Sequence, residues 1–187
     1  ARFKKIDSLL DSLYLQQKFN GNILIAEKGK VLYSRSYGLA NETTKEKLIQ
    51  KSIFELASCS KQFTAMAVVI LNEKKELNFD DKISKYIPEL SDYSGISIRN
   101  LLHHTGGLPD YMTLMDTVWD KSKIATNKDI IDFFSKYKPK TLFEPNSKHE
   151  YSNTGYAILA TVIERVSGHT YAEFLKEQIF EPLRMKN

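Results

Sequence analysis

The sequence predicts a two-lobed α/β fold, in which a helix and an incomplete antiparallel sheet precede a mostly helical lobe. Two observations carry this prediction. Residues 22–37 contain two strand-forming runs around Lys28-Gly29-Lys30, the pattern of a β-hairpin. From Ser58 onward apolar residues recur at helical spacing, and we find no further convincing strand after the hairpin. We therefore expect residues 1–57 to form the helix and hairpin, and residues 58–187 to form the helical lobe.

The first lobe is expected to need strands that this sequence does not supply. Residues 2–18 predict an amphipathic helix that ends before Asn20-Gly21, and the hairpin strands are expected near residues 22–27 and 31–37. Both faces of the first strand are apolar, which suits a strand covered on both sides. Because a lone hairpin is marginal in water, we expect the chain to be a piece of a longer one or to pair with another chain. Its exposed hairpin edge favours self-association.

The second lobe is expected to contain a series of short helices. Capping and breaking residues predict helices over residues 97–103 and 127–137, one that runs from Asn153 or Thr154 to Val166 and ends at Gly168, and a last one that starts at the capping box of Thr170 and Glu173.

Composition excludes several classes of function. The 187 residues carry a net charge of +4, and the densest basic patch (Lys136, Lys138 and Lys140) has no arginine-rich stripe beside it, so we expect no nucleic-acid partner. The longest apolar run, residues 65–71, is too short to cross a membrane. The first five residues do not resemble a signal peptide. The single cysteine, Cys59, excludes an internal disulfide, and the four histidines show no metal-ligand spacing, so we expect neither a metal nor an organic cofactor.

Ser58 and Lys61 are the first candidates for chemistry. They stand three residues apart at the start of an apolar helical stretch, FELASCSKQFTAMAVVIL, so both side chains fall on one face. A serine hydroxyl is a weak nucleophile unless a base takes its proton, and a desolvated lysine amine is such a base. The N-terminal turn of a helix also offers free N–H groups to a developing oxyanion. The same letters fit a helix-capping serine followed by a surface lysine.

The Ser-x-x-Lys pattern occurs a second time, at Ser135 and Lys138. There the helix is ending, because Pro139 follows and no apolar helix comes after the pair. We interpret Ser135 and Lys138 as a solvated helix end.

Tyr151 and Asn153 form a second candidate cluster. They are two residues apart in an extended link before a helix, so they face the same way. The phenol can share a proton with a lysine, and the amide can hold a substrate amide or orient the amine. A core tyrosine beside a helix-capping asparagine fits the same residues.

Taken together, these stretches resemble motifs of the serine β-lactamase and penicillin-binding-protein superfamily, in its class C-like branch of D-alanyl-D-alanine carboxypeptidases and esterases. FELASCSKQFTA resembles the first motif, YSN the second, LLHHTGGLPDY the "LLxHTSGL" loop and IFEPLRM the "PLGM" stretch. The resemblance covers nearly the whole chain and implies a β-lactamase/transpeptidase-like fold. It implies that Ser58 is the acylated nucleophile, that Lys61 and Tyr151 handle protons, and that Asn153 contacts the substrate amide.

Three departures from the family pattern stand out. Gly106 replaces a serine, and Asn146 replaces a glycine, although asparagine tolerates the positive φ that the turn requires. The third motif, Lys-Thr-Gly or His-x-Gly on a later strand, has no match after Asn153. His104-Thr105-Gly106 has suitable letters but precedes the second motif, and we interpret it as loop structure.

The resemblance implies acyl transfer to Ser58 from a small-molecule β-lactam, D-alanyl peptide or ester, in a protein that works outside the cytoplasm. A penicillin-binding sensor that acylates without turnover, and an inactive homologue, remain alternatives. Because one oxyanion donor would come from the missing strand, and losing one costs about 100- to 1,000-fold, we expect residues 1–187 alone to be nearly inactive.

Overall fold

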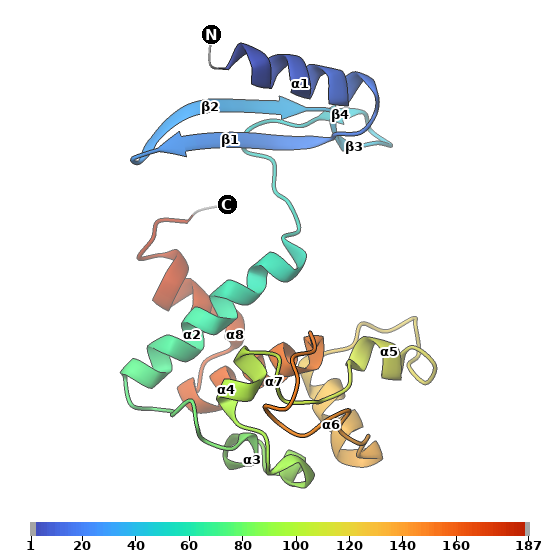
Figure 1. Ribbon diagram of the computed structural model, residues 1–187, viewed down its shortest axis with the longest axis vertical. Coiled ribbons are helices and arrows are strands. Elements are labelled where there is room, and N and C mark those ends of the chain that lie inside the picture. The colour runs from blue at the N-terminus through green and yellow to red at the C-terminus, as the bar shows by residue number, and fades with distance from the viewer. Residues whose placement is uncertain (1–2, 186–187) are drawn as a thin grey trace. The chain divides into compact units, whose positions relative to one another are not determined.

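The computed structural model describes residues 3–185, which fall into two compact units, one within residues 1–55 and the other within residues 56–186 (Figure 1). The first unit consists of one helix and short antiparallel strands, whereas the second is helical.

The N-terminal unit contains the predicted helix and hairpin. Helix α1 (Lys4–Leu15) is followed by strands β1 (Gly21–Glu27) and β2 (Lys30–Tyr37), which pair antiparallel with Gly21 opposite Tyr37. A bulge between Ile25 and Ala26 shifts the register near the turn. The helix and the hairpin of the sequence prediction are therefore confirmed.

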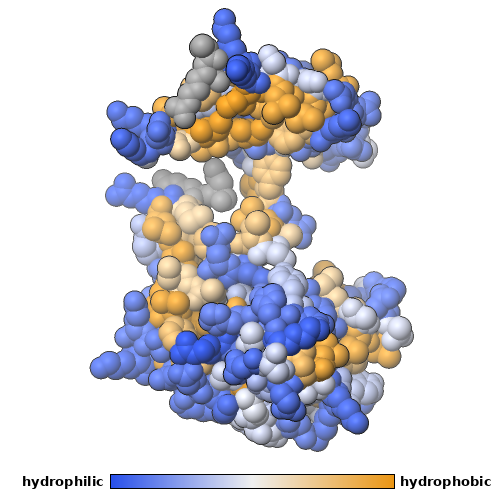
Figure 2. All heavy atoms as spheres, in the orientation of Figure 1, coloured by the Kyte–Doolittle hydropathy of each residue, from blue (hydrophilic) through white to orange (hydrophobic). Residues whose placement is uncertain are grey.

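Helix α1 packs on one face of this hairpin. Leu10 of α1 and Tyr33 of β2 are both buried, and the Tyr33 hydroxyl donates to Asp7 Oδ1 at 2.8 Å. On β1, Leu24 is 63% exposed, so residues 3–55 do not supply the second cover that the apolar pattern of this strand predicts. Figure 2 shows hydrophobic residues gathered on the visible face of this unit.

A second, smaller ladder was not predicted. Strands β3 (Leu39–Asn41) and β4 (Glu46–Lys47) pair antiparallel, so the expectation of no strand after the hairpin is wrong at this point. These strands are too short to show a two-residue period. A residue distant in the sequence ties down β3 instead. Asn20 Nδ2 donates to the Leu39 carbonyl at 3.1 Å, and Asn20 Oδ1 accepts from the Leu39 N–H at 2.8 Å.

The helical unit is organised around one long central helix, α7, which contacts α2, α4, α6 and α8. Its helices are α2 (Lys61–Glu73), α3 (Ile83–Tyr86), α4 (Ile98–Leu102), α5 (Tyr111–Met115), α6 (Asn127–Tyr137), α7 (Asn153–Ser167) and α8 (Tyr171–Leu175). Two 3₁₀ turns (Ala57–Ser60 and Pro88–Tyr93) and a π-helical turn (Lys176–Phe180) complete the unit.

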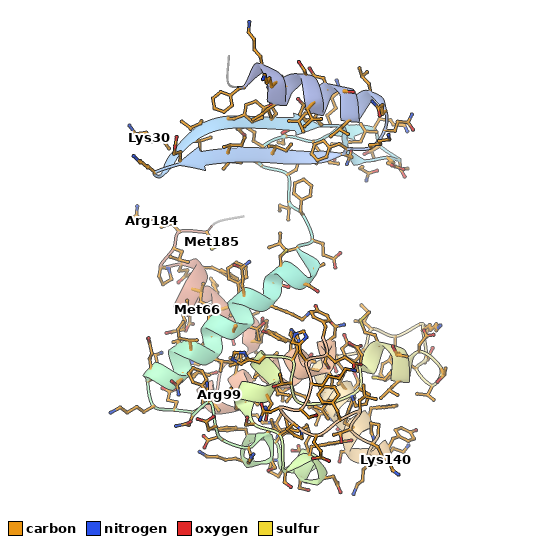
Figure 3. All side chains as sticks on the ribbon, in the orientation of Figure 1. Lys30, Met66, Arg99, Lys140, Arg184 and Met185 are labelled. Carbon is orange, nitrogen blue, oxygen red and sulfur yellow. The ribbon has the colours of Figure 1, made fainter. Side chains whose placement is uncertain are left out.

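Apolar side chains from these helices form one core. Its fully buried members include Val68 and Leu71 of α2 and Ile158, Leu159 and Ile163 of α7. Figure 3 shows the side chains crowded between the helices, while the labelled Met66 of α2 is half exposed. No helix within residues 3–185 is long and apolar enough to cross a membrane.

Local signals fix several helix ends as predicted. Thr170 and Glu173 form the expected capping box at the start of α8, and α7 ends at Gly168, whose φ is 72°. Helix α6 stops at Lys138, which adopts a left-handed conformation (φ 45°) before Pro139. The observed last residue of α7 and first residue of α8 therefore lie within one or two positions of those that the sequence predicts.

The loop over residues 103–110, which leads into α5, runs beside residues 142–150, which precede α7. Gly107 accepts a hydrogen bond from Leu142 N–H at 2.8 Å, and His104 accepts one from Glu150 N–H at 2.9 Å, in each case through the backbone carbonyl. Gly107 has φ 75°, and a Cβ there would lie 2.2 Å from the Phe143 oxygen, so only glycine fits. Asn146 adopts φ 69°, as predicted for the residue that replaces a glycine.

Candidate active site

The four predicted site residues come from two places in the helical unit and meet there. Ser58 lies in the 3₁₀ turn, Lys61 is the first residue of α2, and Tyr151 and Asn153 flank the start of α7. Ser58 Oγ lies 2.6 Å from the Tyr151 hydroxyl oxygen, and Lys61 Nζ donates to Ser58 Oγ at 3.3 Å. Lys61 Nζ also donates to Asn153 Oδ1 at 2.9 Å. The structure thus joins all four side chains in one hydrogen-bonded chain.

The backbone before α2 sets the direction of Ser58. The sequence places Ser58 in the first turn of an α-helix, whereas the structure places it in a 3₁₀ turn just before one. In a 3₁₀ turn side chains three residues apart eclipse one another, which brings Ser58 over Lys61. Ala57 precedes them with φ 46°, a left-handed conformation that costs a non-glycine residue about 1–3 kcal/mol. The surrounding unit holds this strained residue next to the serine.

The charge of Lys61 acts on Tyr151. The hydrogen bond with Lys61, and then the one with Ser58, lower the pKa of the Tyr151 phenol. Lys61 Nζ also lies 4.9 Å from the centre of the Tyr151 ring and 5.5 Å from that of Tyr156. Tyr151 is 48% exposed, so a molecule from solvent can reach the phenol. The arrangement favours a phenol that gives up its proton more readily than an ordinary tyrosine.

His104 packs behind Tyr151. Its ring lies 4.6 Å from the Tyr151 ring and 5.1 Å from the Tyr156 ring, and its Nδ1 accepts the Ser152 N–H at 3.2 Å. Burial, followed by the charges of His149 and Lys61, lowers the pKa of His104. His104 has φ 56°, a second left-handed residue at the site. The loop structure that the sequence predicts here is present, whereas no local sequence pattern indicates that this loop supports Tyr151.

Asp110 is a further site residue that sequence reasoning missed. Its Oδ2 accepts from both the backbone N–H and the side-chain amide of Asn153, at 2.8 and 2.9 Å. Its Oδ1 accepts from Met112 N–H at 2.9 Å, which caps helix α5. An aspartate directly before a short apolar segment is a capping signal that could have pointed to it.

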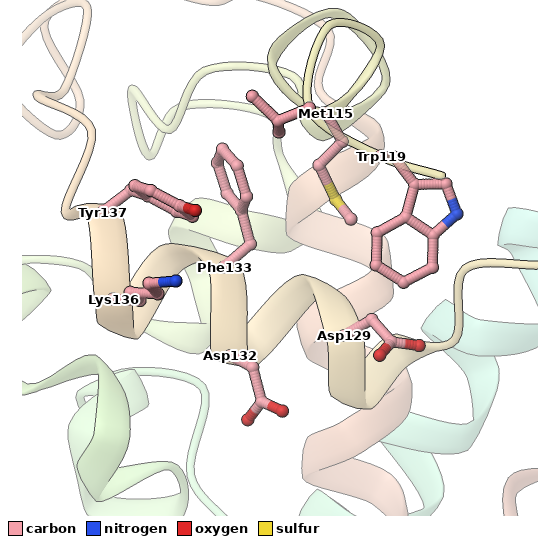
Figure 4. A pocket seen from close by; sticks show the side chains of 8 residues that line it. Met115, Trp119, Asp129, Asp132, Phe133, Lys136 and Tyr137 are labelled. Carbon is pink, nitrogen blue, oxygen red and sulfur yellow. The ribbon is translucent and has the colours of Figure 1, made fainter. Parts of the chain in front are cut away.

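The second Ser-x-x-Lys pair, Ser135 and Lys138, lies in a different setting. Lys138 Nζ pairs with Asp92 Oδ2 at 2.9 Å on the surface, at the end of α6. Nearby, a pocket of about 230 Å³ lies between α5, the segment that follows it and α6 (Figure 4). Its lining residues are Met115, Val118, Trp119, Asp129, Asp132, Phe133, Lys136 and Tyr137. None of the four predicted site residues lines this pocket.

A neighbouring hollow of about 340 Å³ adjoins the site through Met112. It is lined by Tyr111, Met112, Met115, Asp116, Trp119, Lys121 and Ala125. The Met112 sulfur lies 3.5 Å from Asn153 Nδ2. Within the described residues, no group of three or more His, Cys, Asp and Glu side chains is placed to hold a metal ion.

Comparison with known sequences gives a consistent result. A family model described as Beta-lactamase matches residues 6–187. Penicillin-binding protein 4* of Bacillus subtilis (strain 168) is 46% identical over 182 residues, which cover 97% of this chain and 40% of that protein. Teichoic acid D-alanine hydrolase of Staphylococcus aureus is 33% identical over 187 residues, which cover 100% of this chain and 44% of that protein. The chain thus spans less than half the length of these relatives.

Solved structures share the fold. The octameric penicillin-binding protein homologue from Pyrococcus abyssi matches with a TM-score of 0.86 and 27% identity, over 100% of this chain and 44% of that one. The D-amino acid amidase from Ochrobactrum anthropi SV3, complexed with L-phenylalanine, matches with a TM-score of 0.77 and 30% identity, over 93% of this chain and 48% of that one. These matches confirm the fold class that the sequence predicts.

Proposed function

The chain belongs to the beta-lactamase family, and from that membership we propose that it carries the nucleophile and proton-handling groups of a serine acyl-transfer hydrolase. The observation that carries the proposal is the double contact on Ser58 Oγ, from the Tyr151 hydroxyl at 2.6 Å and from Lys61 Nζ at 3.3 Å. A serine needs a partner that takes its proton as it attacks, and two such partners lie within reach here.

Acylation begins with attack of Ser58 Oγ on the carbonyl carbon of the substrate. As that bond forms, the hydroxyl proton passes to the Tyr151 oxygen, the nearer of the two bases, whose lowered pKa increases the share of phenolate. The proton then goes to the leaving nitrogen or oxygen as its bond to the carbonyl carbon breaks. Water attacks the resulting acyl-serine in the second half of the reaction and restores the hydroxyl.

Lys61 and Asn153 keep this proton path in place. The ammonium of Lys61 contacts both Ser58 and the Asn153 oxygen, so it stabilises negative charge on the phenolate without leaving its position. The Asn153 amide has two N–H hydrogens, and one is used by Asp110. The other faces the weak Met112 sulfur contact, which a substrate carbonyl can replace.

The substrate class proposed is a D-alanyl ester or amide, or a β-lactam. The names of two relatives support it, a teichoic acid D-alanine hydrolase and a penicillin-binding protein. With such a substrate the protein would act outside the cytoplasm, and protease treatment of intact cells, which should degrade an exposed protein, tests that location.

Covalent labelling tests the proposal. Ser58→Ala should abolish labelling by a fluorescent penicillin or phosphonate in the complete polypeptide that carries these residues, because the attacking oxygen is gone. Ser135→Ala is the matched control and should label like the parent protein. Intact mass would show one adduct on the parent and none on Ser58→Ala. An adduct that persists on Ser58→Ala would contradict the assignment.

A further inference from the structure

We propose that Asp110 is a positioning residue, which sets the orientation of the Asn153 amide and thereby the place of the Lys61 ammonium. The inference rests on the function proposed for Ser58. It concerns a residue that does not touch Ser58 and that acts through a neighbour.

The Asn153 side chain has two possible orientations that differ by exchange of its oxygen and its amino group. Only the oxygen can accept a hydrogen bond from the Lys61 ammonium, because an amino group facing an ammonium would set donor against donor. Lys61 Nζ donates to Asn153 Oδ1 at 2.9 Å, so the site requires the first orientation. Something on the other side of the amide must exclude the second.

Asp110 supplies that selection. An ionised carboxylate only accepts hydrogen bonds, so it requires the amino group of Asn153 on its side. Asp110 Oδ2 accepts from Asn153 Nδ2 at 2.9 Å and from the Asn153 backbone N–H at 2.8 Å. With the Asp110 acceptor on one side and the Lys61 donor on the other, the Asn153 amide can adopt one orientation only.

The carboxylate of Asp110 is itself held in place. Its Oδ1 accepts the Met112 N–H, and the residues on either side of Asp110 are tied to Thr154. The Thr154 hydroxyl donates to the Pro109 carbonyl at 2.7 Å and accepts from the Tyr111 N–H at 2.8 Å. Thr154 is 0% exposed, so this clamp lies in the interior. A fixed acceptor can select an orientation, whereas a mobile one could not.

Asp110 also serves the start of helix α7. Ser152, the residue at the N-cap position of α7, makes no side-chain capping bond, and the carboxylate of Asp110 accepts the first N–H of the helix instead. A purely structural role would therefore also predict some loss of stability on substitution. The test must separate slower chemistry from a weaker fold.

A double-mutant cycle makes that separation. Asp110→Ala, Asn153→Ala and the double variant are prepared in the complete polypeptide, and the second-order rate constant for acylation by a fluorescent penicillin is measured together with the melting temperature. Asp110→Ala alone should slow acylation by about 100-fold, the cost of a misplaced reacting group. In the Asn153→Ala background it should slow acylation by less than about threefold, because the amide that it orients is absent.

Two further variants keep the result interpretable. Asp120→Ala removes an exposed carboxylate outside both hollows, which pairs with Lys123, and should leave acylation unchanged. Asp110→Asn is nearly isosteric and replaces Asp110→Ala in the cycle if the alanine variant does not fold. Its amide has one oxygen for the donors of Asn153 and Met112, which the two carboxylate oxygens share in the parent, so acylation should slow less than in Asp110→Ala and only when Asn153 is present.

Equal slowing by the Asp110 substitution with and without Asn153 would overturn the inference and leave the role of Ser58 intact. Labelling that persists on Ser58→Ala would instead overturn the proposed function and this inference with it.

Discussion

The two Ser-x-x-Lys pairs of this chain have the same residue types and spacing but different surroundings. Ser58 and Lys61 stand before a buried helix and meet Tyr151 and Asn153, which lie more than ninety residues further along the chain. Ser135 and Lys138 stand at the end of α6, where Lys138 is left-handed and its ammonium pairs with Asp92 at the surface. Spacing alone therefore does not place a serine beside a group that can take its proton. The partners that come from elsewhere in the sequence distinguish the two pairs.

The largest expected difference between the two pairs concerns their lysines. Lys61→Arg keeps a positive charge but carries it on a planar guanidinium, whose donors point in other directions than those of an ammonium, so the paired contacts with Ser58 and Asn153 should be lost. Acylation should slow by about 100- to 10,000-fold, the usual contribution of proton transfer, because the transfer from Ser58 to Tyr151 depends on those contacts. Stopped-flow labelling with a fluorescent penicillin measures it. Lys138→Arg should keep the parent rate. If both changes slowed acylation equally, the two pairs would not differ in function as we propose.

A smaller effect is expected from the tyrosines beside each pair. Tyr151→Phe removes the oxygen that contacts Ser58 and should slow acylation by about 100-fold. This is the low end of the range for proton transfer, because the contact of Lys61 with Ser58 remains. Tyr137→Phe, which changes an exposed tyrosine two residues after Ser135, should have no effect.

The pH dependence sharpens this expectation. Because hydrogen bonds with Lys61 and Ser58 lower the pKa of Tyr151, its phenolate forms at a lower pH than that of an ordinary tyrosine, and the acylation rate should rise with pH and level off early. Lys61→Met removes the main cause, so the pKa of Tyr151 should return toward about 10. Ultraviolet difference titration against Tyr151→Phe follows it. A titration that does not move in Lys61→Met would rule out this coupling.

The smallest effect concerns His104, which packs on Tyr151 at the first pair only. Burial lowers the pKa of His104 below its unfolded value of about 6.5, so the unfolded chain binds the proton more tightly. The stability linked to neutral His104 is thus complete above about pH 6.5 and is lost as the pH falls through the folded pKa. Denaturant unfolding at several pH values should show this loss, and His104→Gln should remove it. His103→Gln, at an exposed neighbour, is the control, and the same pH slope in His104→Gln would refute the expectation.

Features that depend on local sequence could be predicted. The hairpin, the ends of α7 and the capping box at Thr170 follow from residues that lie within a few positions of one another. The pairing of Ser58 and Lys61 follows from their spacing, and their approach to Tyr151 and Asn153 was expected from the family resemblance.

Features that depend on single distant contacts could not be predicted. Strand β3 is tied to the residue before β1 by one side chain, since Asn20 bonds both polar groups of Leu39. The role proposed for Asp110 depends on the approach of its loop to the start of α7, which Thr154 holds from inside the unit. The strain at Ala57 has no signal in the sequence, since alanine is an unfavourable residue for a left-handed conformation.

The sequence distance between the two halves of the site has a consequence during synthesis. Tyr151 follows Ser58 by 93 residues, and a ribosome adds about 5–20 residues each second. The serine is therefore made roughly 5–20 s before the tyrosine that contacts it. During that interval the nascent chain carries a serine without its partner, and we expect chains arrested before residue 150 to resist an acylating label. Reactivity of this serine would then require translation of the second segment, after most of the helical unit has been made.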